Sequence, residues 1–366
     1  MKTPSPRCRL SLLFLFAFGS TMSLRAQGVA TTGSVGLLSM PAASASDTIV
    51  SLPLHRPDVY RGRIVSATGT EMILQQASFE EDAFNGSCYL LLESGPAEGA
   101  WFPILDTGAG SVTVDVGTGE DAGFLIAGVA VKIIPFWTLD TVFPNGKGVN
   151  ASGSLLPVTR IMLSDQTRAG IRLAPSSSFL YYAGTDHGGE GWRRFGFAPA
   201  VKFDDQILVP GTSMIVRHDN GSGTVFENLG HVQTSSFSIR LGTIAPDTAQ
   251  DHAIGLGIAV PVTLEESQLF ESGAFAASAT LEQPSDQLLV YDQTTALKNR
   301  VPSAVYYYYG GAQSGGAGWR LLGDPGTVRD AATVFHPAQG FVIRKAGGAV
   351  SQSSRWTARP AYLDLP

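Results

Sequence analysis

The sequence predicts an all-β protein, with a small N-terminal antiparallel barrel or sandwich followed by an internally duplicated pair of β-modules and one or two short helices. Three observations support this class. The 366 residues include 42 glycines and 21 prolines, which favour many turns between short elements. Segments rich in aromatic and β-branched residues alternate with these turns. A long segment of the C-terminal part also repeats at a fixed offset.

The N-terminal residues 1–26 have the pattern of a secretory signal peptide. Basic residues precede an apolar run at 10–18, and Ala26 supplies a small residue at the expected cleavage point. The run is too short to serve as a stable transmembrane anchor, and we find no other stretch of about 18 apolar residues. We therefore expect an exported protein that is periplasmic or extracellular.

Charge and cysteine content restrict the partners that we expect. Removal of the signal peptide leaves 25 − 4 basic against 31 acidic residues, so the formal charge changes from −6 to −10, the basic residues lost being Lys2, Arg7, Arg9 and Arg25. A chain with this negative charge is not expected to bind nucleic acid, because binding to the phosphates requires basic patches on the protein. Cys88 would be the one remaining cysteine, which excludes an intramolecular disulfide. We expect no cofactor, and the candidate partners are a glycan or an envelope protein.

Two segments precede the duplicated region. Residues 27–47 are rich in Ala, Ser, Thr and Gly, and this composition predicts a flexible leader. Residues 48–136 contain strand-like runs such as RGRIVSA, CYLLLES and VAVKIIP, several of them separated by glycine turns. This second segment is the expected N-terminal β-domain.

Residues 137–366 contain an internal duplication. Trp192 and Trp319 lie 319 − 192 = 127 positions apart, each in a Gly-Trp-Arg sequence. At this offset the repeat cores 165–217 and 292–344 share 18 identities in 53 positions without a gap. Because a one-residue slip would turn every side chain of a strand to the opposite face, this register predicts one fold for both segments.

Signals for helices are few. Thr263 is followed three residues later by Glu266, which is the spacing of a capping box at the start of a helix. The sequence WTLDTVF at 137–143 is the expected short counterpart in the first copy.

Several longer motifs together resemble a known protein family. They are LESGPAEGAWFPI, FWTLDTVFP, AVPVTLEESQLFESGAF, SDQLLVYD, YYYYGGAQSGGAGWR and QGFVIRKA. In this combination the chain is similar to a family of exported, glycine-rich, β-strand-rich bacterial proteins of unassigned activity, over roughly residues 59–356. The resemblance implies export and a shared fold, and it supplies no catalytic residue.

Asp106 is the candidate for catalysis. It begins an Asp-Thr-Gly sequence after two apolar residues, which resembles the motif of aspartic proteases. Those enzymes pair two such carboxylates across a water molecule, and this chain has no second copy of the motif. Activity would require a homodimer that contributes Asp106 twice. The alternative is a plain turn, for which Asp and Gly are well suited.

Asp186, His187 and Glu190 are the candidates for metal binding. An imidazole and two carboxylates within five residues could hold a metal ion. The equivalent loop of the second copy, GAQSGGAG, lacks all three side chains. A solvated hairpin is therefore the other interpretation.

Aromatic side chains are the candidates for carbohydrate binding. Rings on an exposed sheet face could stack on sugars, and the residues concerned are Trp192, Trp319, Tyr307 and Tyr309. The alternative is that these rings pack within the modules, with polar groups satisfied at the edge. In that interpretation the tryptophans are packing anchors.

Arg217 and Arg344 close apolar strands at equivalent positions of the two copies. We expect each to pair with an acid or with carbonyl groups, and Asp165 and Asp292 are the repeated acids available. The leading interpretation of the chain is a structural or interaction protein of the cell envelope or exterior, without catalysis. A carbohydrate-binding module and a dimeric aspartic-type hydrolase are the alternatives.

Overall fold

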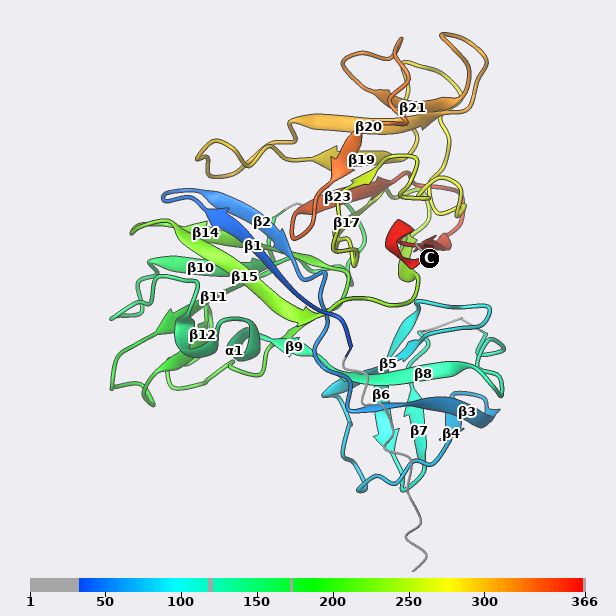
Figure 1. Cartoon of the computed structure of the whole chain (residues 1–366). Helices are drawn as coiled ribbons and strands as arrows, with labels where there is room; N and C mark the ends of the chain where they lie inside the picture. Colours follow the sequence, from blue (N-terminus) through cyan, green and yellow to red (C-terminus); the bar gives the residue numbers. More distant parts are fainter. Residues whose placement is uncertain (1–32, 118–120, 172–173, 365–366) are drawn as a thin grey trace, which may run out of the picture. The chain divides into compact units, whose positions relative to one another are not determined.

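The computed structural model describes residues 33–117, 121–171 and 174–364, and these residues are almost entirely strands and turns (Figure 1). The predicted all-β class is confirmed. The expected signal peptide and the first residues of the expected leader lie outside the described residues. Within the described part of the chain, no helix is long and apolar enough to cross a membrane.

Six antiparallel strands form a closed barrel in the order β3-β4-β7-β6-β5-β8. Their bounds are β3 Tyr60–Thr68, β4 Glu71–Leu74, β5 Cys88–Leu92, β6 Trp101–Thr107, β7 Ser111–Val114 and β8 Ala130–Pro135. Alternate positions turn apolar side chains inward, among them Ile64, Leu90, Ile104 and Val131. Closure leaves no free sheet edge within this unit.

The duplication forms two five-stranded sheets with the same order of strands. The first is β12-β11-β10-β14-β2, and the second, read from the same end, is β21-β20-β19-β23-β17. In the first copy the strands are β2 Asp47–Ser51, β10 Thr159–Leu163, β11 Ser177–Tyr182, β12 Gly191–Arg194 and β14 Ser213–His218. In the second they are β17 Gln250–Gly255, β19 Gln287–Val290, β20 Ala304–Tyr309, β21 Gly318–Leu321 and β23 Gly340–Lys345. Strands β11, β12 and β14 map onto β20, β21 and β23 at both ends with the offset found in the sequence.

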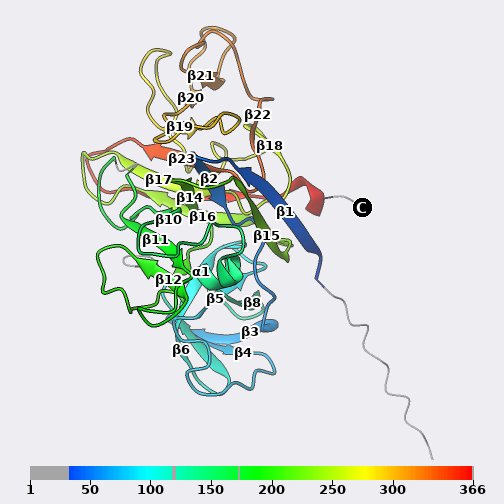
Figure 2. The same ribbon diagram turned by 90° about the vertical axis from the view of Figure 1, so that its left-hand side faces the viewer.

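Each copy also has a two-stranded ribbon and a short strand pair. The ribbons are β1 Val35–Ala42 with β15 Thr224–His231, and β16 Phe237–Gly242 with β24 Ser353–Ala358. Strands β1 and β15 lie side by side in both views (Figures 1 and 2). The short pairs are β9 Trp137–Thr138 with β13 Ile207–Leu208, and β18 Val262–Thr263 with β22 Thr333–Phe335.

The barrel is an insertion in the first copy. It lies in the chain between β2 and β9, whereas residues 256–261 alone connect the equivalent strands β17 and β18. The first copy therefore begins with β1, inside the segment that we expected to be a flexible leader. Glycine, serine and proline within β1 concealed a strand whose inward side chains, such as Met40 and Ala42, belong to the core of the first copy.

The expected helix starts have different outcomes. In the first copy, Thr138 and Thr141 cap the short helix α1 Leu139–Val142, which is followed by the 3-10 turn η1 Pro144–Gly146. In the second copy, Thr263 and Glu266 exchange the hydrogen bonds of a capping box, but the residues that follow form turns instead of a helix. A second 3-10 turn, η2 Ala361–Leu363, ends the described chain.

The two copies contact each other reciprocally. Ser51 N donates to Ala338 O at 2.9 Å, and the equivalent Gly255 N donates to Gly211 O at 3.0 Å. Two isolated antiparallel β-bridges also connect the copies, one between Val50 and Gln339 and the other between Thr212 and Ile254. Each copy has its own apolar core, and a smaller cluster that includes Ile49, Leu289 and Val342 lies between the copies. The two halves are thus related by a pseudo-twofold arrangement of one module.

Candidate functional site

The repeated Gly-Trp-Arg sequence builds the same structure twice. Trp192 and Trp319 are fully buried, and each backbone N–H donates to an aspartate, Asp204 or Asp330, at 2.7 Å. These acids are 126 positions apart instead of 127, so the loop of one copy shifts locally by one residue. The large ring fills the module core, as the packing interpretation requires.

The arginine of the repeated sequence is buried in both copies, and no carboxylate among the described residues pairs with it. Arg193 donates to the carbonyls of His187, Gly189 and Trp192, and Arg320 donates to the equivalent three carbonyls. Each guanidinium also lies over a tyrosine ring, Tyr182 at 5.6 Å and Tyr309 at 5.7 Å from the centroid. The backbone carbonyls of the glycine-rich turn before the tryptophan therefore surround the guanidinium group and accept its hydrogen bonds.

The four aromatic residues considered for sugar stacking are not available for it. The exposed fractions are 0% for Trp192, 1% for Trp319, 0% for Tyr307 and 3% for Tyr309. Tyr307 further donates its hydroxyl to Leu281 O at 2.6 Å. The stacking hypothesis is therefore wrong for these residues, because all four side chains are buried.

Asp186, His187 and Glu190 lie on an exposed turn. His187 Nε2 is 3.4 Å from Asp186 Oδ2, and His187 has a positive φ of 52°. Within the described residues, no group of three or more His, Cys, Asp or Glu side chains could hold a metal ion. The turn instead supplies backbone carbonyls that accept hydrogen bonds from Arg193. In the second copy, the carbonyls of Ser314 and Gly316 accept the equivalent bonds from Arg320.

Asp106 lies in the barrel, at the end of β6. It is exposed opposite Thr113 of β7, next to a bulge in the register. Gly108 N donates to Ser111 O, which closes the hairpin, and Thr107 donates its hydroxyl to Asn85. The Asp-Thr-Gly sequence thus has the geometry of a plain hairpin turn, the alternative that its composition allowed.

The Asp-Gln-Thr sequences at 165–167 and 292–294 begin two loops that reach the other copy, one after β10 and one after β19. We call these loops the arms. Asp165 and Asp292 each accept hydrogen bonds from the threonine two residues later, which closes a local turn. The glutamine in the middle of each Asp-Gln-Thr sequence forms hydrogen bonds with the other copy. Gln293 bonds both N and O of Ile49 in β2, and Gln166 donates to Ala253 O in β17.

Arg217 and Arg344 pair with acids other than those we expected. Arg217 holds Asp47 through Nε and Nη2 at 2.5 and 2.6 Å, and Arg344 holds Asp251 in the same two-bond manner. The prediction of an acid partner is therefore correct. The prediction that Asp165 and Asp292 are these partners is wrong, because their carboxylates accept hydrogen bonds within the turns of the arms. Hydrogen bonding to the carboxylate raises the pKa of both arginines.

Sequence reasoning missed Asp47 and Asp251. Both begin an apolar strand, in SDTIV and QDHAI, but they are 251 − 47 = 204 positions apart. The inserted barrel accounts for the 204 − 127 = 77 additional positions. An acid at the start of two similar strands was the available signal, and a search at one fixed offset could not find it.

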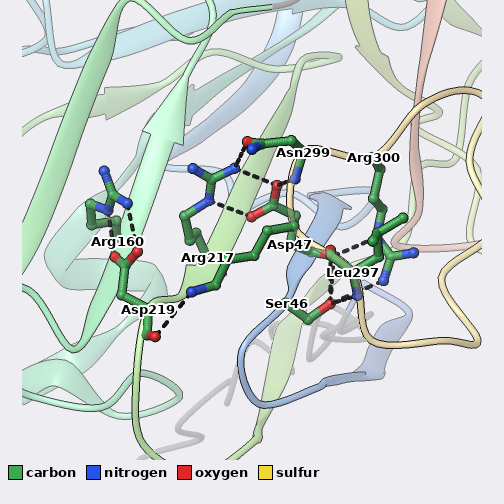
Figure 3. Close-up of polar contacts among 9 residues, drawn as sticks. Ser46, Asp47, Arg160, Arg217, Asp219, Leu297, Asn299 and Arg300 are labelled. Atoms are coloured by element: carbon green, nitrogen blue, oxygen red, sulfur yellow. Dashed lines mark hydrogen bonds and ion pairs between the residues drawn. The ribbon is translucent and has the colours of Figure 1, made fainter.

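Figure 3 shows how an arm of the second copy fastens the first. Asn299 N donates to Asp47 Oδ2 at 2.7 Å, and Arg300 donates to Asp47 O and to the hydroxyl of Ser46. Lys298, two positions before Arg300, reaches Asp219 O. This network lies at the wall of a cavity between the copies, which has a volume of about 310 Å³.

The ribbon of β1 and β15 presents a second candidate surface. Its outward face carries four aliphatic side chains with exposed fractions of 49–61%, namely Val35, Leu37, Val225 and Leu229. A groove of about 450 Å³ runs beside them, lined also by Pro144, Lys147 and Glu227. Lys147 and Glu227 form an exposed ion pair at 3.0 Å.

The ribbon of the second copy has a different outward face. Leu37 faces Leu229 across the first ribbon, and the equivalent pair of the second ribbon is Ser238 with Thr357. Farther along this ribbon, Arg355 lies 5.8 Å from the ring centre of Phe102 in the barrel. The copies therefore differ on this side of the ribbon, which is aliphatic and exposed at Leu37 and Leu229 in the first copy and polar and covered at Ser238 in the second.

Comparisons with protein families, with characterised proteins and with solved structures find no match to this chain.

Proposed function

We propose that this protein is a non-catalytic structural protein, exported from the cytoplasm, that assembles with copies of itself through the outward face of the ribbon β1–β15. The observation that carries the proposal is the row of exposed aliphatic side chains on this face. Exposed apolar side chains that lie among polar residues are typical of a contact surface. Glu227 lies between Val225 and Leu229 on this face, opposite Ser39, and its ion pair with Lys147 neutralises its charge.

The comparison between the copies supports a role in binding. Folding of the ribbon requires its inward side chains, such as Phe226 and Met40, which are buried. On this side of the second ribbon Ser238 faces Thr357, and the two hydroxyls bond each other while Ser238 is buried. Aliphatic residues at these positions are therefore not a requirement of the module, and a partner surface gives them a use.

The charges beside the row favour a second copy as the partner. Most symmetric assemblies use the same patch on both subunits, so a residue at the patch must be compatible with its own rotated image. The aliphatic row satisfies this condition. The cation of Lys147 and the anion of Glu227 also satisfy it, because a twofold rotation can bring the ammonium group of one copy opposite the carboxylate of the other.

Export is supported by the sequence alone. The basic residues, the apolar run at 10–18 and Ala26 have the order of a secretory signal peptide. The resemblance to exported, glycine-rich bacterial proteins agrees with this placement. Expression in a bacterium with the full N-terminus should give a protein outside the cytoplasm that begins at or near Gln27, and an exported form that retains Met1 would contradict the cleavage.

Sedimentation velocity over a hundredfold range of concentration tests the assembly. The wild-type chain should shift toward a dimer or larger species as its concentration rises. The variant Leu37→Ser/Leu229→Thr carries the outward residues of the second copy and should stay monomeric. The matched control Val350→Ser replaces an exposed aliphatic residue elsewhere, and it should assemble like the wild type.

Two results would overturn the proposal. One is a wild-type chain that remains monomeric at every concentration. The other is a ribbon variant that assembles as strongly as the wild type. Because all three replaced side chains are exposed, each variant should keep the far-ultraviolet circular dichroism of the folded protein.

A further inference from the structure

The cavity between the copies is lined by both halves of the molecule. Apolar side chains form one part of the lining, among them Ile49, Met162, Ile215, Ala253 and Val342. Polar and charged side chains form the other part, and they are Asp47, Ser164, Ser213, Arg217, Asp251, Tyr291, Asn299 and Arg300. Asn299 is exposed, so the cavity can be reached from solvent.

The cavity lies beside two pairs of equivalent positions at which the side chains of the two copies differ in size. Ser164 of the first copy is equivalent to Tyr291 of the second, since 291 − 164 = 127. Ala253 is likewise equivalent to Ile49, because both lie next to the glutamine of the opposite arm. All four of these residues line the cavity, so in each pair one wall carries the smaller side chain. Two large residues would have filled space that the chain leaves empty.

Protein interiors are packed closely, and a void costs stability because its lining loses van der Waals contacts. The fold itself accepts tyrosine and isoleucine at these positions, since it holds them in the other copy. Small residues at both positions are therefore not required by the module. A ligand that occupies the space would restore the lost contacts.

The two carboxylates of the lining are already paired with arginines, and Arg300 is held by neutral acceptors. Asp47 is held by Arg217, and Asp251 is held by Arg344. The guanidinium of Arg300 donates to Ser46 and to three backbone carbonyls, those of Asp47, Asp292 and Thr295. A cationic ligand would find both carboxylates of the lining already paired, an anionic ligand would compete with the four neutral acceptors that Arg300 already holds, and burial would cost either ligand its hydration.

Neutral hydrogen-bonding groups also line the cavity. Burial raises the pKa of Tyr291 to about 12, so its hydroxyl keeps its proton at neutral pH. Ser164 and Ser213 supply two further hydroxyl groups. These groups can both donate and accept.

We propose that the cavity between the copies, bounded by Ser164, Ala253 and Tyr291, is a binding site for a neutral small molecule with an apolar body and one or more hydroxyl groups. Ile49, Ile215 and Val342 would contact the apolar body. The hydroxyl groups of the ligand would meet Tyr291 and the serines. The site is separate from the ribbon face and does not depend on assembly.

Ligand-observed nuclear magnetic resonance titration with benzyl alcohol tests this site. The wild-type chain should bind the alcohol saturably at one site per chain. Benzoate and benzylamine, which have the same ring and carry a charge, should bind at least about tenfold more weakly. The variant Ala253→Ile should weaken binding of the alcohol by at least about tenfold and unfold at the same temperature as the wild type or higher.

Two further variants separate the site from other effects. Ser164→Tyr also fills the space from the opposite copy and should lose binding in the same way. Ala279→Ile places the same added bulk on an exposed turn and should bind like the wild type. Leu37→Ser/Leu229→Thr should bind the alcohol unchanged, which distinguishes this site from the assembly surface.

Three results would overturn the proposal. They are the absence of saturable binding of benzyl alcohol to the wild-type chain, equal binding by the folded Ala253→Ile and Ser164→Tyr variants, or equal affinity for the neutral and the charged probes.

Discussion

At the scale of single residues, the repeated tryptophan and arginine are parts of one packing unit. Trp319 lies against Phe275 and Tyr308, and Arg320 is enclosed by the carbonyl groups of the turn that precedes it. A buried arginine that is satisfied by carbonyl groups requires the turn to keep its backbone geometry. Gly318 has a φ of 150° in that turn, and an added Cβ would lie 3.0 Å from the carboxylate of Asp330. The sequence thus repeats tryptophan, arginine and glycine together.

Trp192→Ala and Trp319→Ala should each lower the free energy of unfolding by about 3–5 kcal/mol, because a large buried ring is removed. Denaturant unfolding followed by circular dichroism measures this loss. Leu156→Ala, at a side chain that is 79% exposed, should change the free energy by less than about 0.5 kcal/mol. Tryptophan variants as stable as this control would refute the role of the rings as packing anchors.

His55 should make the stability depend on pH. Burial lowers its pKa to about 4, an effect opposed by the hydrogen bond to the carbonyl of Arg56. The unfolded chain has a histidine pKa of about 6.5, so it binds a proton that the folded chain excludes between pH 6.5 and 4. The contribution is complete above about pH 6.5 and falls by about 3 kcal/mol toward pH 4.

Urea unfolding at pH 7 and at pH 4.5 measures this dependence. His55→Gln removes the titrating ring, and its loss of stability between the two values should be smaller than that of the wild type. Some loss should remain, because burial also lowers the pKa of His218 and His252. Equal losses in the variant and the wild type would contradict the assignment to His55.

At the scale of elements, the two arms fasten the copies unequally. Gln293 bonds both N and O of Ile49, at 2.7 and 2.9 Å, whereas Gln166 bonds Ala253 O at 2.9 Å. Gln293→Ala should therefore destabilise the fold more than Gln166→Ala, since a buried donor or acceptor left without a partner costs about 1–3 kcal/mol. Paired unfolding measurements compare the two, and a larger effect of Gln166→Ala would contradict the geometry.

The pairs Arg217–Asp47 and Arg344–Asp251 join β14 to the edge strand β2 and β23 to the edge strand β17. Asp251→Asn keeps the shape of the side chain and removes the charge, so Arg344 stays partly buried without its anion. We expect a loss of about 3–5 kcal/mol, as is typical of breaking a buried pair on one side. A loss below about 1 kcal/mol, measured by thermal and denaturant unfolding, would show that solvent compensates the arginine.

The sequence predicted the elements that depend on local pattern and on the repeat. The strands that hold Tyr181 and Tyr308 follow from aromatic and β-branched runs, and their equivalence follows from the gap-free register. Strand β1 could not be predicted, because half of its apolar residues face solvent. The partners Asp47 and Asp251 could not be predicted either, since contacts over 170 and 93 positions depend on where the barrel is inserted. The aromatic rings were ambiguous because alternation alone does not say which face of a strand is covered.

At the scale of the whole molecule, the barrel is an addition to a module that folds without it elsewhere in the same chain. Trp137 Nε1 donates to Leu54 O at 2.8 Å, so the two ends of the insertion lie close together. A chain in which residues 256–261 are copied in place of 56–135 should keep cooperative unfolding and its strand content. Circular dichroism and a single unfolding transition would show this, and a chain that fails to fold would mean that the first copy needs the barrel.

The two copies agree where the module needs a residue to fold, and they differ where we assign binding. The most direct test of this account is the free energy of unfolding of a variant that gives the first ribbon and the cavity the residues of the other copy. Its changes are Leu37→Ser, Val225→Ser, Leu229→Thr, Ser164→Tyr and Ala253→Ile. The account predicts a free energy of unfolding, measured with denaturant, equal to or higher than that of the wild type. A loss of more than about 2 kcal/mol, the size typical of a damaged core, would contradict it.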